Sequence, residues 1–128
     1  MQLCLLHLDD ALKSQSEFML TCERDGAQQI EAMQAGARIR LWGRENQLDI
    51  LHTMLAEQFI MSTGEPRLCF MGSGDFHHVT AMLLELTLEK QSEPVTVIHF
   101  DNHPDWCRFP RTFNCGGWVN LALALPHV

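Results

Sequence analysis

The stretch "RLCFMGSGDFHHVTAMLLELTLEK", residues 67–90, changes its hydrophobic period halfway along. Residues 67–72 are mostly apolar and follow a turn signal, a pattern that is typical of a buried strand. A glycine-rich turn comes next, and helical spacing up to about Lys90 is then carried by four apolar residues, Val79, Met82, Leu83 and Leu86. The stretch therefore predicts a strand, a polar turn and a helix that covers the strand.

The same alternation continues on both sides of this unit. "RIRLWG" (38–43) predicts a short strand, 46–61 an amphipathic helix, and "VTVIHF" (95–100) the next strand. Near the N-terminus, "QLCLLHL" (2–8) predicts a strand and 26–36 a short helix, with loop and helix both open for the residues between them. Strands that alternate with helices predict an α/β fold whose parallel sheet is covered by helices.

Length and composition are those of a single domain, because 128 residues with 46% hydrophobic content can fill one core. The formal net charge of -7 disfavours binding to nucleic acid or to an anionic membrane and favours a cationic ligand. The apolar N-terminus meets Asp9 and Asp10 too early for a signal peptide, and the five cysteines contain no C-x-x-C pair. We therefore expect a cytoplasmic protein with reduced thiols and a small-molecule substrate.

Three polar residues follow "VTVIHF" at alternate positions, Asp101, His103 and Asp105. Alternate side chains of an extended chain point to the same side, so those of this D-x-H-x-D motif are expected to converge. Pro104 has no N–H for a central ladder, so the strand is expected to leave the sheet here, at the edge where polar groups of α/β sheets collect. Crowded carboxylates and imidazoles are stabilised by a cation among them. The motif predicts a divalent metal site, and the simpler alternative is a polar loop with exposed aspartates.

The ligand types indicate which cation such a site would hold. Oxygen ligands with a minority of imidazole favour Mn²⁺ or Mg²⁺, with Zn²⁺ and Fe²⁺ as alternatives. His99 lies inside the apolar run and is predicted to be a core or interface histidine rather than a ligand.

Two motifs together resemble a known family. "GSGDFHH" (72–78) and, about two dozen residues later, "VIHFDNHPDW" (97–106) resemble the first two metal motifs of the arginase-like superfamily, the ureohydrolases, with histone deacetylases as more distant relatives. They resemble more narrowly an uncharacterised arginase-like group, and the match covers about residues 67–121. The resemblance implies a three-layer α/β/α fold around a mostly parallel sheet, a pair of Mn²⁺ ions bridged by hydroxide, and hydrolysis of C–N bonds in guanidino or amide substrates.

The resemblance also implies roles for individual residues. Asp101 would bridge the two metals and take part in catalysis, His103 would bind one metal, and Asp105 would bind the other. From the glycine-rich turn, His77 is the expected metal ligand and His78 the expected acid–base partner.

The sequence departs from the family pattern at two places. Cys115 precedes Gly116 where ureohydrolases have an H-G dipeptide, and a thiol ligand, a proton carrier or a small buried residue are all open roles for it. No D-x-D motif follows Asp105, so the chain 1–128 is expected to be one arginase-like α/β domain that corresponds to the N-terminal part of a longer domain. By itself it is expected to hold at most one weakly bound ion and to show no ureohydrolase activity.

Two other functions remain as alternatives. One is a non-catalytic metal-binding or assembly module, in which an exposed sheet edge pairs with another chain and a homo-oligomer is one outcome. The other, less favoured, is a metallophosphoesterase with carboxylate and histidine ligands.

Overall fold

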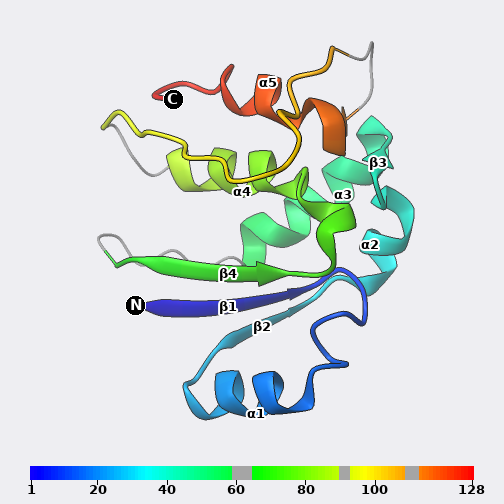
Figure 1. The fold of residues 1–128 in the computed structure, drawn as a ribbon, viewed down its shortest axis with the longest axis vertical. Helices are drawn as coiled ribbons and strands as arrows, with labels where there is room; N and C mark the ends of the chain where they lie inside the picture. The colour runs from blue at the N-terminus through cyan, green and yellow to red at the C-terminus, as the bar shows by residue number, and fades with distance from the viewer. Residues whose placement is uncertain (59–64, 90–92, 109–112) are drawn as a thin grey trace.

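The computed structural model describes residues 1–58, 65–89, 93–108 and 113–128 (Figure 1). The strands are β1 (Gln2–His7), β2 (Gln28–Glu31), β3 (Trp42–Gly43), β4 (Arg67–Met71) and β5 (Phe113–Asn114). The helices are α1 (Ser16–Arg24), α2 (Met33–Ile39), α3 (Glu45–Gln58), α4 (Val79–Leu88) and α5 (Trp118–Ala122). Two short 3-10 helices, η1 (Gly74–Phe76) and η2 (Cys115–Gly117), precede α4 and α5.

A three-stranded parallel sheet forms the centre of the fold, with the strand order β2-β1-β4. β1 is central because it is apolar on both faces, with Leu5 and Leu6 fully buried on opposite sides of the strand. Parallel neighbours require helical crossovers, and α1 and the α2–α3 pair provide them. This confirms the predicted α/β class with a parallel sheet.

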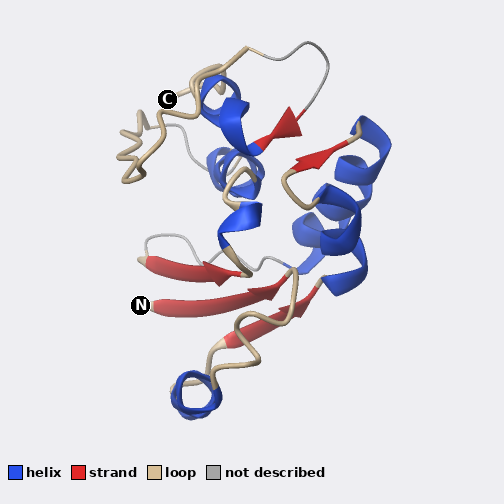
Figure 2. Ribbon diagram, turned by 45° about the vertical axis from the view of Figure 1, so that its right-hand side comes forward, coloured by secondary structure: helices blue, strands red, loops and turns tan. Residues whose placement is uncertain are grey.

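Helices cover both faces of this sheet (Figure 2). The larger cluster packs alternate residues of β1, among them Leu6, against Leu51 and Leu55 of α3 and apolar residues of α4. The smaller cluster packs Leu5 of β1 against Cys22 of α1. Within the described residues, no helix combines the length and the apolar character needed to cross a bilayer.

A second group of elements lies on the side of α4 that faces away from β1. Trp118 and Ala122 of α5 are buried against Ala81 of α4, and Phe113 of β5 packs on the same cluster. β5 pairs antiparallel with β3, which joins this group to the segment before α3. These contacts place the segment after residue 93 next to the turn that opens α4 (Figure 1).

The strands predicted over 2–8 and 67–72 are confirmed by β1 and β4, and the helix predicted over 46–61 is confirmed by α3 as far as Gln58. Residues 59–61 of that helix, and Lys90 at the end of the next, lie outside the described residues.

Two predictions about residues 26–43 were wrong. The helix predicted over 26–36 is instead β2 followed by α2, because pairing with β1 buries Ile30 and overrides the local pattern. The strand predicted over 38–43 is reduced to Trp42–Gly43, because Ile39 reaches the core as the last residue of α2. A close contact fixes this helix, since a side chain at Gly36 would fall on the backbone of Leu8.

The prediction of a strand over 95–100 was also wrong. The segment is extended, with Val95, Val97 and His99 half-buried and the residues between them exposed, but it forms no ladder with the other described strands. It runs beside α4, with the N–H of Val95 donating to the carbonyl of His127 (Figure 1). A strand is stabilised by backbone hydrogen bonds to a neighbouring strand. Here the segment instead lies against α4, with which it lines a common pocket.

Candidate metal centre

The turn between β4 and α4 is built around Phe76. Gly72 has a positive φ of 37°, and a side chain there would meet the Phe76 ring at 2.9 Å. Phe76 is almost completely buried in the main core and so serves as an apolar anchor for the turn. The short helix η1 ends at Phe76 and so places His77 just before the start of α4.

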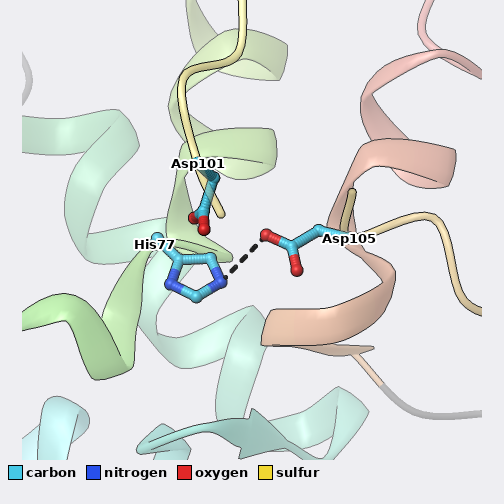
Figure 3. A group of neighbouring side chains, drawn as sticks. All are labelled: His77, Asp101 and Asp105. Atoms are coloured by element: carbon cyan, nitrogen blue, oxygen red, sulfur yellow. Dashed lines mark ion pairs between the residues drawn. The ribbon is translucent and has the colours of Figure 1, made fainter. Parts of the chain in front are cut away.

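Three predicted residues lie together (Figure 3). One ligand atom from each of His77, Asp101 and Asp105 lies within 4.8 Å of the others. The Nε2 atom of His77 is 3.2 Å from Oδ2 of Asp105, and the Asp101 carboxylate points toward both (Figure 3). His77 thus converges with aspartates that lie 24 or more positions later in the chain, although it precedes a helix and they lie in irregular chain.

Asp105 is held more firmly than the other two. Its side chain is only 5% exposed, and its Oδ2 accepts a hydrogen bond of 3.0 Å from the indole Nε1–H of Trp118. The N–H of Val119 donates to its carbonyl at 3.1 Å. Its φ is +50°, a region that aspartate and asparagine adopt more readily than most residues. The start of α5 therefore holds both the carboxylate and the backbone of Asp105.

Both ring nitrogens of His77 face acceptors. Nδ1 is 2.6 Å from the carbonyl oxygen of Gly74, whereas Nε2 lies between the Asp105 carboxylate and the carbonyl oxygen of Cys115, at 3.2 Å and 3.3 Å. A proton on Nδ1 satisfies the first contact and fixes the tautomer. Nε2 then faces only oxygen atoms, an environment that favours a metal cation at this place.

The structure keeps His103 apart from this group. The N–H of His103 donates to Oδ1 of Asp101 at 3.0 Å, and this local turn bends the chain after Asp101. The imidazole of His103 is 81% exposed, with Nδ1 at 3.6 Å from Asp101. The alternation expected for D-x-H-x-D ends at the bend. The backbone hydrogen bond from His103 lowers the pKa of the Asp101 carboxyl, and the nearby His77 and His99 act in the same direction.

His78 is placed in the interior, away from the group. Its Nδ1 is 3.1 Å from the Cys115 thiol, which in turn lies 3.2 Å from the carbonyl of Asp75. Burial lowers the pKa of His78 to about 4, and burial also raises the pKa of the Cys115 thiol. Both groups are thus favoured as neutral species, and together they connect the turn before α4 to η2.

His99 is the residue that sequence reasoning missed. Its Nε2 lies 3.7 Å from Oδ2 of Asp101 and 3.7 Å from Oδ2 of Asp105, and its ring packs edge-on against Trp118 at 5.0 Å. The sequence contains a signal for this position. The alternation of His and Asp begins at His99, and two residues of extended chain place His99 and Asp101 on one side.

An open pocket of about 470 Å³ leads to the group. One end is formed by His77, His99, Asp101 and Trp118, and the walls by apolar residues of α4 and of the extended segment, among them Leu84, Leu88 and Val97. A small molecule with an apolar part could therefore approach the carboxylates from the side of α4.

Comparison with known proteins gives one informative match. An uncharacterized protein of Thermotoga maritima is 36% identical over 59 residues, which are 46% of this chain and 22% of that protein. The chain therefore spans a minor part of the length of this relative. No protein-family model matches the chain, and no solved structure matches it.

Proposed function

We propose that the chain binds one divalent cation through His77, Asp101 and Asp105 and uses it to hydrolyse a C–N bond in a small amide or guanidino substrate. The observation that carries this proposal is the grouping of the three ligand atoms within 4.8 Å of one another. The resemblance of "GSGDFHH" and "FDNHPDW" to the metal motifs of arginase-like enzymes supports the same reaction class. Mn²⁺ is the proposed cation, with Mg²⁺, Zn²⁺ and Fe²⁺ as alternatives.

The donor set fits a divalent ion. Two carboxylates and one imidazole bring two negative charges and a nitrogen lone pair to one point, which matches the ligand preferences of Mn²⁺, Zn²⁺ and Fe²⁺. The oxygen atoms around Nε2 of His77 would stabilise a positively charged ion at that place. The Asp105 side chain is almost fully buried, and buried carboxylates are commonly paired with a cation or a metal.

The remaining residues have separable tasks in such a reaction. A cation bound there would polarise the scissile carbonyl or guanidinium group and make a water molecule more acidic. Asp101 lines the pocket, so its carboxylate would lie beside the attacking water and could accept a proton from it. Asp105 and Trp118 hold the geometry, and Leu84 and Leu88 offer an apolar wall for the rest of the substrate.

The test begins with protein purified in chelator. Adding Mn²⁺ should raise the melting temperature, because an ion that binds only the folded state stabilises it by mass action. Asp101→Asn should remove most of that rise. The Mn²⁺-loaded protein is then screened against carboxamides and guanidino compounds. We expect metal-dependent release of amine or ammonia from a carboxamide or from a guanidino compound. If no divalent cation changes the melting temperature, the proposed metal site is refuted.

A second function, a non-catalytic metal-binding or assembly module, is favoured by a separate observation. Ile98 and Phe100 are 72% and 92% exposed on the outer side of the extended segment, where no described strand pairs with the backbone. Metal binding without turnover of any amide, together with concentration-dependent association in analytical ultracentrifugation, would favour this function over hydrolysis.

A further inference from the structure

We infer that His99 supplies a fourth ligand to the cation, so that the site consists of two imidazoles and two carboxylates around a single ion. This inference rests on the proposed metal site and adds to it a donor outside the D-x-H-x-D motif. It also assigns His103 no ligand role in this chain.

The distances support His99 as a donor. Ligands of one ion, each bound at about 2.0–2.2 Å, lie at most about 4.4 Å apart. The Nε2 atom of His99 is 3.7 Å from Oδ2 of Asp101 and 3.7 Å from Oδ2 of Asp105, both within this limit, although the group whose ligand atoms all lie within 4.8 Å of one another contains His77 and the two aspartates without His99. The Oδ1 atom of Asp101 is already bound to the N–H of His103, so Oδ2 is the oxygen that remains for a cation.

The packing also orients the ring. His99 is half-buried, and its edge-on contact with Trp118 at 5.0 Å restrains the imidazole. The same Trp118 donates its indole N–H to Asp105, so one side chain fixes both a nitrogen donor and an oxygen donor. His103, by contrast, is 81% exposed and has no comparable support. Pre-positioned donors bind a cation more tightly than free ones, because less ordering is required.

The donor set has a chemical consequence. Imidazole suits Zn²⁺ and Fe²⁺, carboxylate suits Mn²⁺ and Mg²⁺, and two of each favour the transition ions over Mg²⁺. With a single His, the site would discriminate less against Mg²⁺. The proposed fourth ligand therefore predicts that Mg²⁺ competes poorly for this site.

The experiment compares His99→Phe with His103→Ala. Phenylalanine keeps an aromatic ring against Trp118 and removes both nitrogen donors, whereas the exposed imidazole of His103 serves as the matched control. Mn²⁺ affinity is measured by titration calorimetry, and coordinated imidazoles are counted from nitrogen modulation in pulsed EPR of bound Mn²⁺. We expect His99→Phe to weaken binding by at least about tenfold, as even changes beside a metal ligand do. The imidazole count should fall from two to one. His103→Ala should change neither.

The outcomes separate this inference from the proposed function. If wild-type protein binds Mn²⁺ and His99→Phe binds it equally well, the ligand role of His99 is refuted and the proposed metal site is not. If the second imidazole disappears in His103→Ala instead, His103 is the ligand and the inference is overturned. If wild-type protein binds no divalent cation, the proposed function fails and the inference with it. Should His99→Phe fold poorly, the imidazole count in the wild type and in His103→Ala still decides the question.

Discussion

Among individual residues, Asp105 shows how backbone and side chain are constrained together. Its positive φ of 50° directs a buried carboxylate toward His77, and the indole of Trp118 keeps it there. Strained backbone of this kind costs roughly 1–3 kcal/mol and persists where the surroundings determine it. Asparagine shares the tolerance for this conformation and keeps an acceptor oxygen, whereas alanine has neither property.

Asp105→Asn and Asp105→Ala should therefore differ in stability but agree in metal binding. In chelator, Asp105→Asn should unfold in urea within about 1 kcal/mol of the wild type, whereas Asp105→Ala should lose about 2 kcal/mol or more, because the indole N–H is left unpaired. Neither variant should gain stability from Mn²⁺. Equal stability of the two variants would mean that the backbone conformation and the indole contact matter less than we infer.

At the scale of elements, α2 lies against the backbone that follows β1, in close contact at Gly36. Gly36 lies in α2 where a Cβ atom would come within 2.7 Å of the carbonyl carbon of Leu8. Replacing a glycine within a helix by alanine normally stabilises a protein, by up to about 1 kcal/mol. Here the contact is with backbone, which cannot move aside without shifting the end of β1.

Gly36→Ala should consequently destabilise the protein by at least about 2 kcal/mol, measured by urea unfolding at equilibrium. Gly74→Ala is the matched control, because Gly74 has nothing within 4 Å of the added atom and should change stability by less than about 0.5 kcal/mol. Stabilisation by Gly36→Ala would show that α2 sits farther from β1 than in this structure.

At the scale of the whole molecule, the candidate site depends on three segments that meet at one end of α4. His77 comes from the turn after β4, His99 and Asp101 from the extended segment, and Asp105 from the chain that α5 supports. Among the described residues, one group of three or more potential ligands satisfies the spacing for a metal ion.

The metal content should accordingly be one ion per chain. Equilibrium dialysis against Mn²⁺ followed by elemental analysis should give a stoichiometry near one, and chelator should return the melting temperature to its metal-free value. A second ion held loosely by exposed carboxylates would be removed by raised salt, because exposed pairs are screened. Two ions that survive high salt would contradict a single-site arrangement.

The sequence by itself determined the α/β class, the strands β1 and β4, and helices α3 and α4, and it predicted that Asp101 and Asp105 lie together, whereas His77 was expected only from the family resemblance. These features follow from periodicity and from polar residues placed at the ends of apolar runs, which are local properties of the chain. The family resemblance and its metal chemistry stay a prediction.

Only the tertiary structure decided where β2 forms, that 95–100 runs beside α4 without joining the sheet, and that His99 rather than His103 faces the two carboxylates. Each of these depends on a partner distant in sequence: β1 for β2, α4 for the extended segment, and Trp118 for His99 and Asp105. Local propensity differs by about 1 kcal/mol or less between alternatives, so burial and hydrogen bonding across the fold override it.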